Sequence, residues 1–276
     1  MTDLFPPFAP DANELPKRSF KPVPFRVIAP NLITLLALCL GLTAIRFTHE
    51  ARFEPAVLMI IIAAMLDGVD GRVARLLKGT SRFGAELDSL ADFVNFGVAP
   101  GLILYSFVLH HLGSFGWVVA LILAISMALR LARFNAMLDD PSRPEWKKDF
   151  FVGVPAPAGA LTSLLPLYLS FLGVPMGPAM APVALVYVVV IAFLSVSTIP
   201  TFSGKTMGKR VPRQWVLPIF VVTVAVFGLC VSYPFEALAL TTILFLSTIP
   251  VSIARYRQLE RAHATTAEPA AEASEG

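Results

Sequence analysis

The stretch Asp67-Gly68-Val69-Asp70-Gly71-Arg72-Val73-Ala74-Arg75 decides how this chain is interpreted. It follows residues 56–66, a run that is almost entirely aliphatic. Eight residues beyond it comes a second acidic stretch, Gly84-Ala85-Glu86-Leu87-Asp88-Ser89-Leu90-Ala91-Asp92. Carboxylates at the end of such an apolar run are costly in a membrane unless something compensates them, so they mark a functional site.

The composition is that of a membrane protein. Hydrophobic residues make up 56% of the chain and charged residues 15%, and the mean hydropathy is +0.71. A soluble domain is about a quarter charged, so this balance predicts a polytopic membrane protein. The isoelectric point of about 9.0 could suggest nucleic-acid binding. In a membrane protein it is better explained by basic cytoplasmic loops, and we expect no nucleic-acid partner.

Hydropathy and charge together predict the topology. A membrane-spanning helix needs about 20 mostly apolar residues. We expect an all-α integral membrane protein with eight spans, at about residues 31–47, 54–78, 84–109, 115–137, 155–173, 179–198, 214–232 and 236–255. All but Arg46 and Arg52 of the 22 Lys+Arg residues then fall on one side of the membrane, together with both termini. The positive-inside rule makes that side the cytoplasm, and we expect the inner membrane of a bacterium.

The chain is organised as one membrane domain with two flanking segments. We expect a basic juxtamembrane segment at residues 1–29, a transmembrane catalytic domain at residues 30–258 and a disordered tail at residues 259–276. The tail is small and acidic in composition, which is typical of disorder. Pro30 and Asn31 open the first predicted span, with Asn31 as its helix cap.

The spacing of the aspartates predicts a metal site. Residues three or four apart share one face of a helix, so Asp67 pairs with Asp70 and Asp88 pairs with Asp92. An antiparallel turn between the second and third spans would bring the four carboxylates together at the cytoplasmic side. They would repel one another, and two divalent cations would supply the compensating charge. Oxygen ligands favour Mg²⁺ or Mn²⁺. Zinc is not favoured, because His49, His110 and His111 fall on the outer side in this topology and His263 falls in the tail.

The acidic pattern resembles the signature of a known family. Asp-x-x-Asp-Gly-x-x-Ala-Arg, eight residues, then Gly-x-x-x-Asp-x-x-x-Asp is the signature of the CDP-alcohol phosphatidyltransferases, and every fixed position matches. The resemblance implies a six-helix core, here followed by two C-terminal helices. It also implies transfer of the phosphatidyl group of CDP-diacylglycerol to an alcohol with release of CMP, in a homodimer surrounded by membrane lipids.

Four further blocks resemble the membrane-integral branch of the family that uses L-serine as the acceptor. They are Asp92–Pro100, Arg130–Asn135, Phe151–Ala158 and Pro200–Lys205. In several branches that use glycerol phosphate or inositol phosphate, a lysine directly follows the last aspartate. Here that residue is Phe93.

The resemblance implies a role for each residue of the signature. The expected metal ligands are Asp67, Asp70, Asp88 and Asp92, and Asp92 is also expected to accept the proton of the acceptor hydroxyl. The residues expected to bind the CDP moiety are Gly71, Ala74, Arg75, Gly84 and Asn31.

Acceptor selectivity must come from other residues. A carboxylate is well matched by arginine, which offers a forked, permanently charged donor. We expect at least one of Arg130, Arg133 and Lys205 to hold the serine carboxylate or a lipid phosphate, with Asn95 as a further polar candidate. The alternative is that these three are ordinary positive-inside residues.

Other functions remain open from sequence. Within the family, the acceptor could be glycerol phosphate, inositol phosphate, choline or a second phospholipid, and the donor could be ether-linked. A divalent-cation transporter would also use intramembrane carboxylates. Transporter sites, however, usually lie near the midplane between repeated halves, whereas these acids gather at one basic edge. A non-catalytic scaffold would be expected to lack motif residues, and none is missing.

Overall fold

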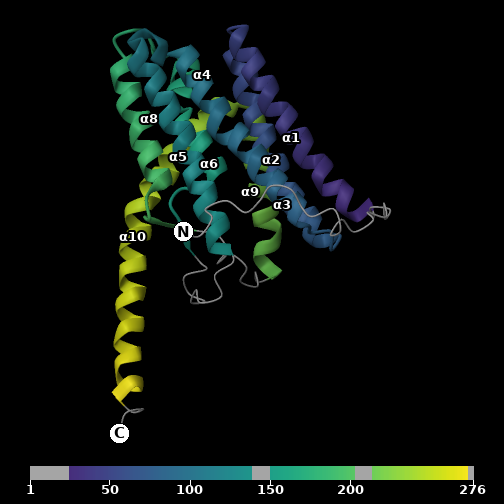
Figure 1. The fold of residues 1–276 in the computed structure, drawn as a ribbon, viewed down its shortest axis with the longest axis vertical. Coiled ribbons are helices and arrows are strands. Elements are labelled where there is room, and N and C mark those ends of the chain that lie inside the picture. The colour runs from purple at the N-terminus through teal and green to yellow at the C-terminus, as the bar shows by residue number, and fades with distance from the viewer. Residues whose placement is uncertain (1–24, 139–149, 203–212, 273–276) are drawn as a thin grey trace, which may run out of the picture.

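The computed structural model describes residues 25–138, 150–202 and 213–272 (Figure 1). Lys205, most of the N-terminal segment and the last four residues lie outside this range. The described chain is built almost entirely of helices. The long ones are α1 (Phe25–His49), α2 (Phe53–Leu76), α5 (Ser114–Leu138), α8 (Ala181–Val196), α9 (Arg213–Ser232) and α10 (Pro234–Glu272).

Two of the predicted spans are made of shorter pieces. The third consists of α3 (Arg82–Asp92), the π-helix η1 (Phe93–Val98) and α4 (Ala99–Phe107), and the 3₁₀ turn η2 (Leu109–Leu112) follows. The fifth consists of α6 (Ala156–Ser163) and α7 (Leu165–Phe171), which are separated at Leu164. Pro166 sits in the first turn of α7, where its missing N–H costs nothing, and it cannot supply a donor to continue α6.

Four helical segments within the described residues are long and apolar enough to cross a membrane. They are Arg26–His49, Arg82–Phe107, Ser114–Met137 and Pro234–Tyr256. α2 is long enough but carries charged residues through its second half. α8 and the apolar part of α9, Leu217–Ser232, are shorter. Within the described residues, four of the eight predicted spans, the first, third, fourth and eighth, thus have the length and composition to cross a membrane.

Helix α1 organises the half of the molecule that carries the aspartates. It packs along α2 and also contacts α3, η1 and α4. Small residues allow these close approaches: a Cβ placed on Gly41 of α1 would collide with the side chain of Asn95 in η1. Asn31 lies inside α1 rather than capping it, because the apolar residues before Pro30 extend the helix back to Phe25.

The other half is built around α5, which packs against α8, α4 and η1. Gly97 and Gly101 face α5 directly: a Cβ added to them would lie 3.2 Å from Met127 Cβ and 3.0 Å from the Ala120 carbonyl oxygen, respectively. Gly97 and Gly101 therefore allow η1 and α4 to pack closely against α5 within the chain. The largest fully buried side chains of the shared core include Tyr168, Phe96 and Ile60.

The structure adds a small sheet that an all-α prediction omits. Strand β1 (Phe150–Val152) pairs antiparallel with β2 (Pro200–Phe202), with Phe151 opposite Thr201. Next to the strands, the Gly153 N–H donates to the Ile199 carbonyl at 2.9 Å, and the Thr201 hydroxyl donates to the Gly153 carbonyl at 2.7 Å. Two of the four serine-branch blocks are thus paired with each other. Their β-branched and aromatic residues suit a strand, but each run is too short to be recognised as one.

The C-terminal helix is longer than the sequence predicts. α10 continues to Glu272 and extends away from the bundle as the yellow helix in Figure 1. Residues 259–272, part of the tail that the sequence predicts to be disordered, are helical in the structure. Alanine and glutamate are common in this segment, and both have high intrinsic helix propensity.

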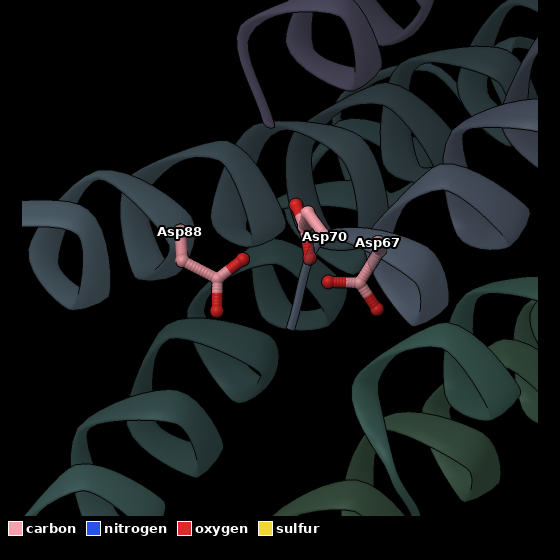
Figure 2. A group of neighbouring side chains, drawn as sticks. All are labelled: Asp67, Asp70 and Asp88. Atoms are coloured by element: carbon pink, nitrogen blue, oxygen red, sulfur yellow. The ribbon is translucent and has the colours of Figure 1, made fainter. Parts of the chain in front are cut away.

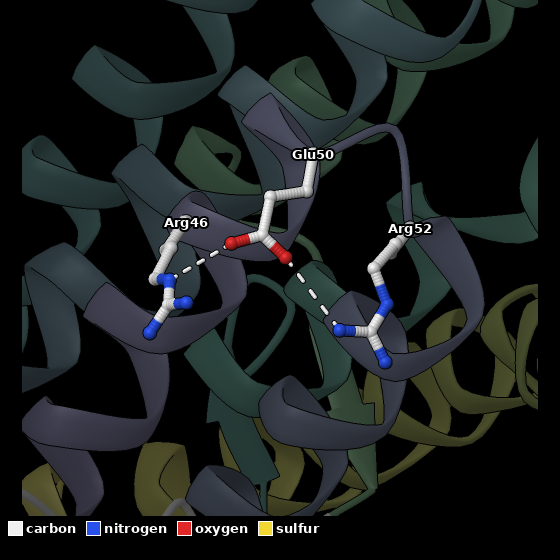
Figure 3. A network of polar contacts seen from close by, with 3 residues as sticks. All are labelled: Arg46, Glu50 and Arg52. Atoms are coloured by element: carbon white, nitrogen blue, oxygen red, sulfur yellow. Dashed lines mark hydrogen bonds and ion pairs between the residues drawn. The ribbon is translucent and has the colours of Figure 1, made fainter.

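The connection between α1 and α2 carries an ion-pair network (Figure 3). The Arg46 Nε donates to one oxygen of Glu50 at 2.9 Å, and Arg52 Nη1 lies 3.5 Å from the other. These are the two arginines that fall outside the basic side in the predicted topology. Glu50 pairs with both, although exposed pairs of this kind add at most about 1 kcal/mol of stability.

Candidate metal and nucleotide site

Three aspartates from two helices meet at one place (Figure 2). Asp67 and Asp70 come from the second half of α2, and Asp88 comes from α3. One carboxylate oxygen from each can be chosen so that the three lie within 4.8 Å of one another. Both helices pack against α1, which holds them in position on either side of the acidic group.

The turn between α2 and α3 sets this arrangement. α2 ends at Leu76, and Lys78 adopts a positive φ of 49°, which reverses the chain. Ser81 then caps α3: its Oγ accepts a hydrogen bond from the Gly84 N–H at 3.0 Å. A cap of this kind satisfies one of the free N–H groups of the first turn and fixes where the helix starts. The start of α3 in turn fixes the position of Asp88.

Asp92 adjoins the group through Asp67. The two carboxyl groups interact with each other, while Asp92 is not one of the three residues that could hold an ion in common. Asp92 is the last residue of α3, and the π-helix η1 begins directly after it. π-helical turns are rare and often occur at functional sites. The sequence predicts that four carboxylates converge. In the structure three of them form one group, and the fourth, that of Asp92, lies beside it.

Thr34 on α1 supports the acidic group, and sequence reasoning missed it. Its hydroxyl donates a 2.7 Å hydrogen bond to Oδ2 of Asp70 and also lies 3.2 Å from the Pro30 carbonyl. Asp70 is only 4% exposed. The one sequence signal was a hydroxyl residue three positions after Asn31 in an otherwise apolar helix, which by itself does not indicate a carboxylate partner.

A pocket of about 380 Å³ opens beside the acids. α1, α2, the turn and α3 all contribute to its wall, which also contains Asp70 and Asp88. All five residues predicted to bind the CDP moiety line it: Asn31, Gly71, Ala74, Arg75 and Gly84. The structure therefore brings this entire set together, from three separate helices.

The two glycines of the nucleotide set differ in their surroundings. A Cβ on Gly71 would have nothing within 4 Å, so the wall at this position is open space. A Cβ on Gly84 would lie 2.8 Å from Asn31 Oδ1 and 3.1 Å from Ser81 Oγ. Gly84 therefore lets α3 approach α1 closely, and Gly71 leaves room for a ligand.

The donor set fits a hard divalent cation. Three carboxylates held this close repel one another unless protonation or counter-charge offsets the repulsion, and a divalent cation supplies that counter-charge. The group contains oxygen donors alone, the ligand type that suits Mg²⁺ or Mn²⁺ and does not favour zinc. His49 is the last residue of α1, and His110 and His111 lie in η2 beyond the far end of α4, so none of the three belongs to the acidic group.

The basic residues expected to bind the acceptor have different environments. Arg130 on α5 interacts electrostatically with Asp92 and Asp67, and its buried Nε has no hydrogen-bond partner within the described residues. Arg133, one turn further, donates through Nη1 to the carbonyls of Val196 and Ser197 at the end of α8. Arg133 is thus engaged in holding α5 to α8, whereas Arg130 faces the acids.

Two asparagines of the serine-branch blocks also differ in their contacts. Asn95 is 1% exposed, packs against Gly41, and its Oδ1 has no hydrogen-bond partner within the described residues. Asn135 donates through Nδ2 to Ser89 Oγ at 2.8 Å and so connects α5 to α3. The blocks that contain these two residues therefore contribute contacts between helices around Asp92.

Comparisons with known proteins all point to one family. The sequence profile described as CDP-alcohol phosphatidyltransferase matches residues 27–198, and one described as CDP-alcohol phosphatidyltransferase 2 matches residues 214–250. A Helicobacter pylori (strain 26695) protein named CDP-diacylglycerol–serine O-phosphatidyltransferase is 36% identical over 221 residues, which cover 79% of this chain and 87% of that protein.

Two further relatives carry the same name. One, from Mycobacterium leprae, is 52% identical over 146 residues, covering 52% of this chain and 48% of its own. Another, from Methanocaldococcus jannaschii, is 36% identical over 131 residues, covering 48% of this chain and 56% of its own. The chain thus spans about half the length of the mycobacterial relatives that it matches.

Proposed function

The chain belongs to the CDP-alcohol phosphatidyltransferase family, and from this membership we propose that it transfers the phosphatidyl group of CDP-diacylglycerol to the hydroxyl of L-serine. The products are phosphatidylserine and CMP. The observation that carries the proposal is the acidic group at the edge of a pocket lined by every nucleotide residue of the signature. The choice of serine is supported by the names of the relatives and by the four serine-branch blocks of the sequence.

Asp67, Asp70 and Asp88 would hold two divalent ions, Mg²⁺ or Mn²⁺, with Asp92 as a further ligand. The bound ions would neutralise the pyrophosphate and stabilise charge that develops during phosphoryl transfer. Thr34 holds the Asp70 carboxylate in place, and α1 holds α2 and α3 at a fixed separation. Partners of this kind around metal ligands tune both orientation and affinity.

The reaction is a displacement at the lipid-side phosphorus. The serine hydroxyl oxygen forms a bond to this phosphorus, and the bond from phosphorus to the CMP oxygen breaks, so that CMP leaves with the electron pair. The hydroxyl proton passes to the Asp92 carboxylate, since a serine hydroxyl is a weak nucleophile unless a positioned base accepts its proton. Arg75 and Gly71 would border the CDP moiety, and their position in the wall of the pocket supports this role.

The proposed topology follows the charge distribution. Eight spans would make a six-helix core from α1 to α8 with α9 and α10 added, and both termini would lie in the cytoplasm. The membrane domain would extend over residues 30–258. The placement of all but two of the 22 Lys+Arg residues on one side supports this orientation. The active site would then face the cytoplasm of a bacterium from its inner membrane, and family resemblance implies a homodimer.

The test is CMP release by the detergent-purified protein supplied with CDP-diacylglycerol, Mn²⁺ or Mg²⁺ and one acceptor at a time. L-serine, glycerol 3-phosphate, inositol phosphate and choline form the acceptor panel. We expect release with L-serine alone, and loss of release with EDTA. Release with a different acceptor would contradict the choice of serine while leaving the family chemistry intact.

A further inference from the structure

The acidic group has two sides, and the pocket occupies one of them. Asp70 and Asp88 line the pocket that contains the nucleotide residues. Asp67 and Asp92 are instead the carboxylates that interact with Arg130 on α5. The acidic group therefore lies between the pocket, whose wall includes α1, and a second side, which contains Arg130 of α5.

The geometry of phosphoryl transfer places the acceptor alcohol on the second side. The attacking and leaving oxygens lie roughly in line in such reactions, with the phosphorus between them. If the leaving CMP occupies the pocket beside Asp70 and Asp88, the acceptor hydroxyl must approach from the opposite side. That side holds Asp92, the proposed base, and Arg130.

Arg130 has a donor that the protein does not use. Its Nε is buried without a hydrogen-bond partner within the described residues, and its guanidinium lies over the ring of Phe134 at 5.7 Å from the centroid. Among those residues its charge forms no ion pair, because the pairs found there join Arg46 and Arg52 to Glu50. Asp67 and Asp92 offset the charge of Arg130, but its Nε donor stays unsatisfied, and a buried donor is costly unless an acceptor completes it.

We infer that Arg130 forms the acceptor subsite and binds the α-carboxylate of the incoming amino acid. The inference rests on the proposed function and gives it a basis for selectivity. Carboxylate and hydroxyl are close together in a 2-amino-3-hydroxy acid, so one small molecule can reach both Arg130 and Asp92. Arginine suits the task because its planar fork matches a carboxylate in two parallel hydrogen bonds. Arg133 is unsuited to it, since the end of α8 already occupies it.

The experiment compares two ligands that differ only at the carboxylate. Binding of L-serine and of L-serinamide, which is neutral at that position, is measured by titration calorimetry on full-length protein loaded with Mn²⁺ and CMP, so that no transfer occurs during the titration. Separate activity assays with CDP-diacylglycerol in place of CMP give the KM for L-serine and for CDP-diacylglycerol. The variants are Arg130→Gln and Arg130→Lys. Arg46→Ala, an exposed arginine far from the acids, is the matched control.

We expect Arg130→Gln to weaken L-serine binding and raise its KM by about 10- to 100-fold, the range of a charge-assisted hydrogen bond. L-serinamide binding and the KM for CDP-diacylglycerol should change less than about twofold, because neither ligand places a carboxylate at this position. Arg130→Lys should fall between wild type and Arg130→Gln, and it carries the test if Arg130→Gln does not fold. The Arg46→Ala control should match wild type.

Three outcomes would overturn the inference. An unchanged affinity for L-serine would remove Arg130 from the subsite. Equal weakening of L-serine and L-serinamide, or a raised KM for CDP-diacylglycerol, would assign Arg130 to the lipid phosphate or to folding. Transfer by wild type to glycerol 3-phosphate but not to L-serine would overturn the proposed function as well, and that result is visible before any variant is made.

Discussion

The hydroxyl of Thr34 donates a 2.7 Å hydrogen bond to Oδ2 of Asp70, and so connects α1 to the acidic group on α2. The bond spans 36 positions of sequence and fixes one oxygen of a carboxylate that is only 4% exposed. Asp70 therefore presents its other oxygen in a defined direction. This contact and others around the site lead to specific expectations for variants of the chain.

Replacing Thr34 by valine should weaken metal binding. The variant keeps the shape of the side chain but removes the donor to Asp70, and such supporting partners are worth about 10- to 100-fold in metal affinity or activity. We expect the Mn²⁺ concentration for half-maximal CMP release to rise about tenfold. Thr43→Val is the control, since that hydroxyl donates to the Cys39 carbonyl on the same helix. An unchanged metal dependence in Thr34→Val would remove Thr34 from the site.

Replacing Gly71 by alanine should impair binding of CDP-diacylglycerol. The new methyl group would occupy the pocket, and overpacking costs about 1–3 kcal/mol, or about 5- to 100-fold in KM. Gly68→Ala is the control: Gly68 is also on α2, and a Cβ there would meet nothing within 4 Å, but it does not line the pocket. Both variants gain helix propensity. Equal KM values in the two variants would contradict the placement of the nucleotide.

Replacing Gly153 by alanine should destabilise the protein. Gly153 has a φ of +75°, and a Cβ there would lie 2.7 and 2.9 Å from the carbonyl oxygens of Ser195 and Ser197. We expect a loss of about 1–3 kcal/mol in the free energy of unfolding, measured by denaturant titration in detergent. The control is Gly177→Ala, where a Cβ meets nothing within 4 Å. A loss of the same size in both variants would mean that the junction with β1 is not constrained.

The proposed topology predicts which residues react with a membrane-impermeant thiol reagent. After replacement of the two free cysteines, Cys39 and Cys230, by serine, a cysteine in place of Glu50 should be labelled on intact cells. A cysteine in place of Arg82 should be labelled only after the membrane is opened. The reverse pattern would invert the topology and place the acids on the outer side.

The acidic site could be predicted from the sequence because the information is local. The spacing of Asp67 and Asp70 defines one helical face, and that of Asp88 and Asp92 defines another. The turn between the two helices is short enough to bring those faces together. The pocket set from Asn31 to Gly84 was identified by resemblance, and the structure brings it together around the acids.

Contacts between distant segments could not be predicted in this way. Thr34 supports Asp70 only because α1 packs along α2, and no local pattern encodes that pairing. Arg130 and Arg133 look alike in sequence, yet one faces the acids and the other holds the end of α8. The β1–β2 sheet joins two three-residue strands that are far apart in the chain, which is below the length at which periodicity is informative.

The most direct test of the central claim follows labelled L-serine into lipid. Wild-type protein with CDP-diacylglycerol and Mn²⁺ is incubated with isotope-labelled L-serine, and the lipid extract and the free CMP are measured by mass spectrometry. We predict labelled phosphatidylserine and CMP in equal amounts, with both lost after EDTA treatment and in Asp92→Asn. CMP without labelled lipid, or labelled lipid that persists in EDTA, would contradict the account.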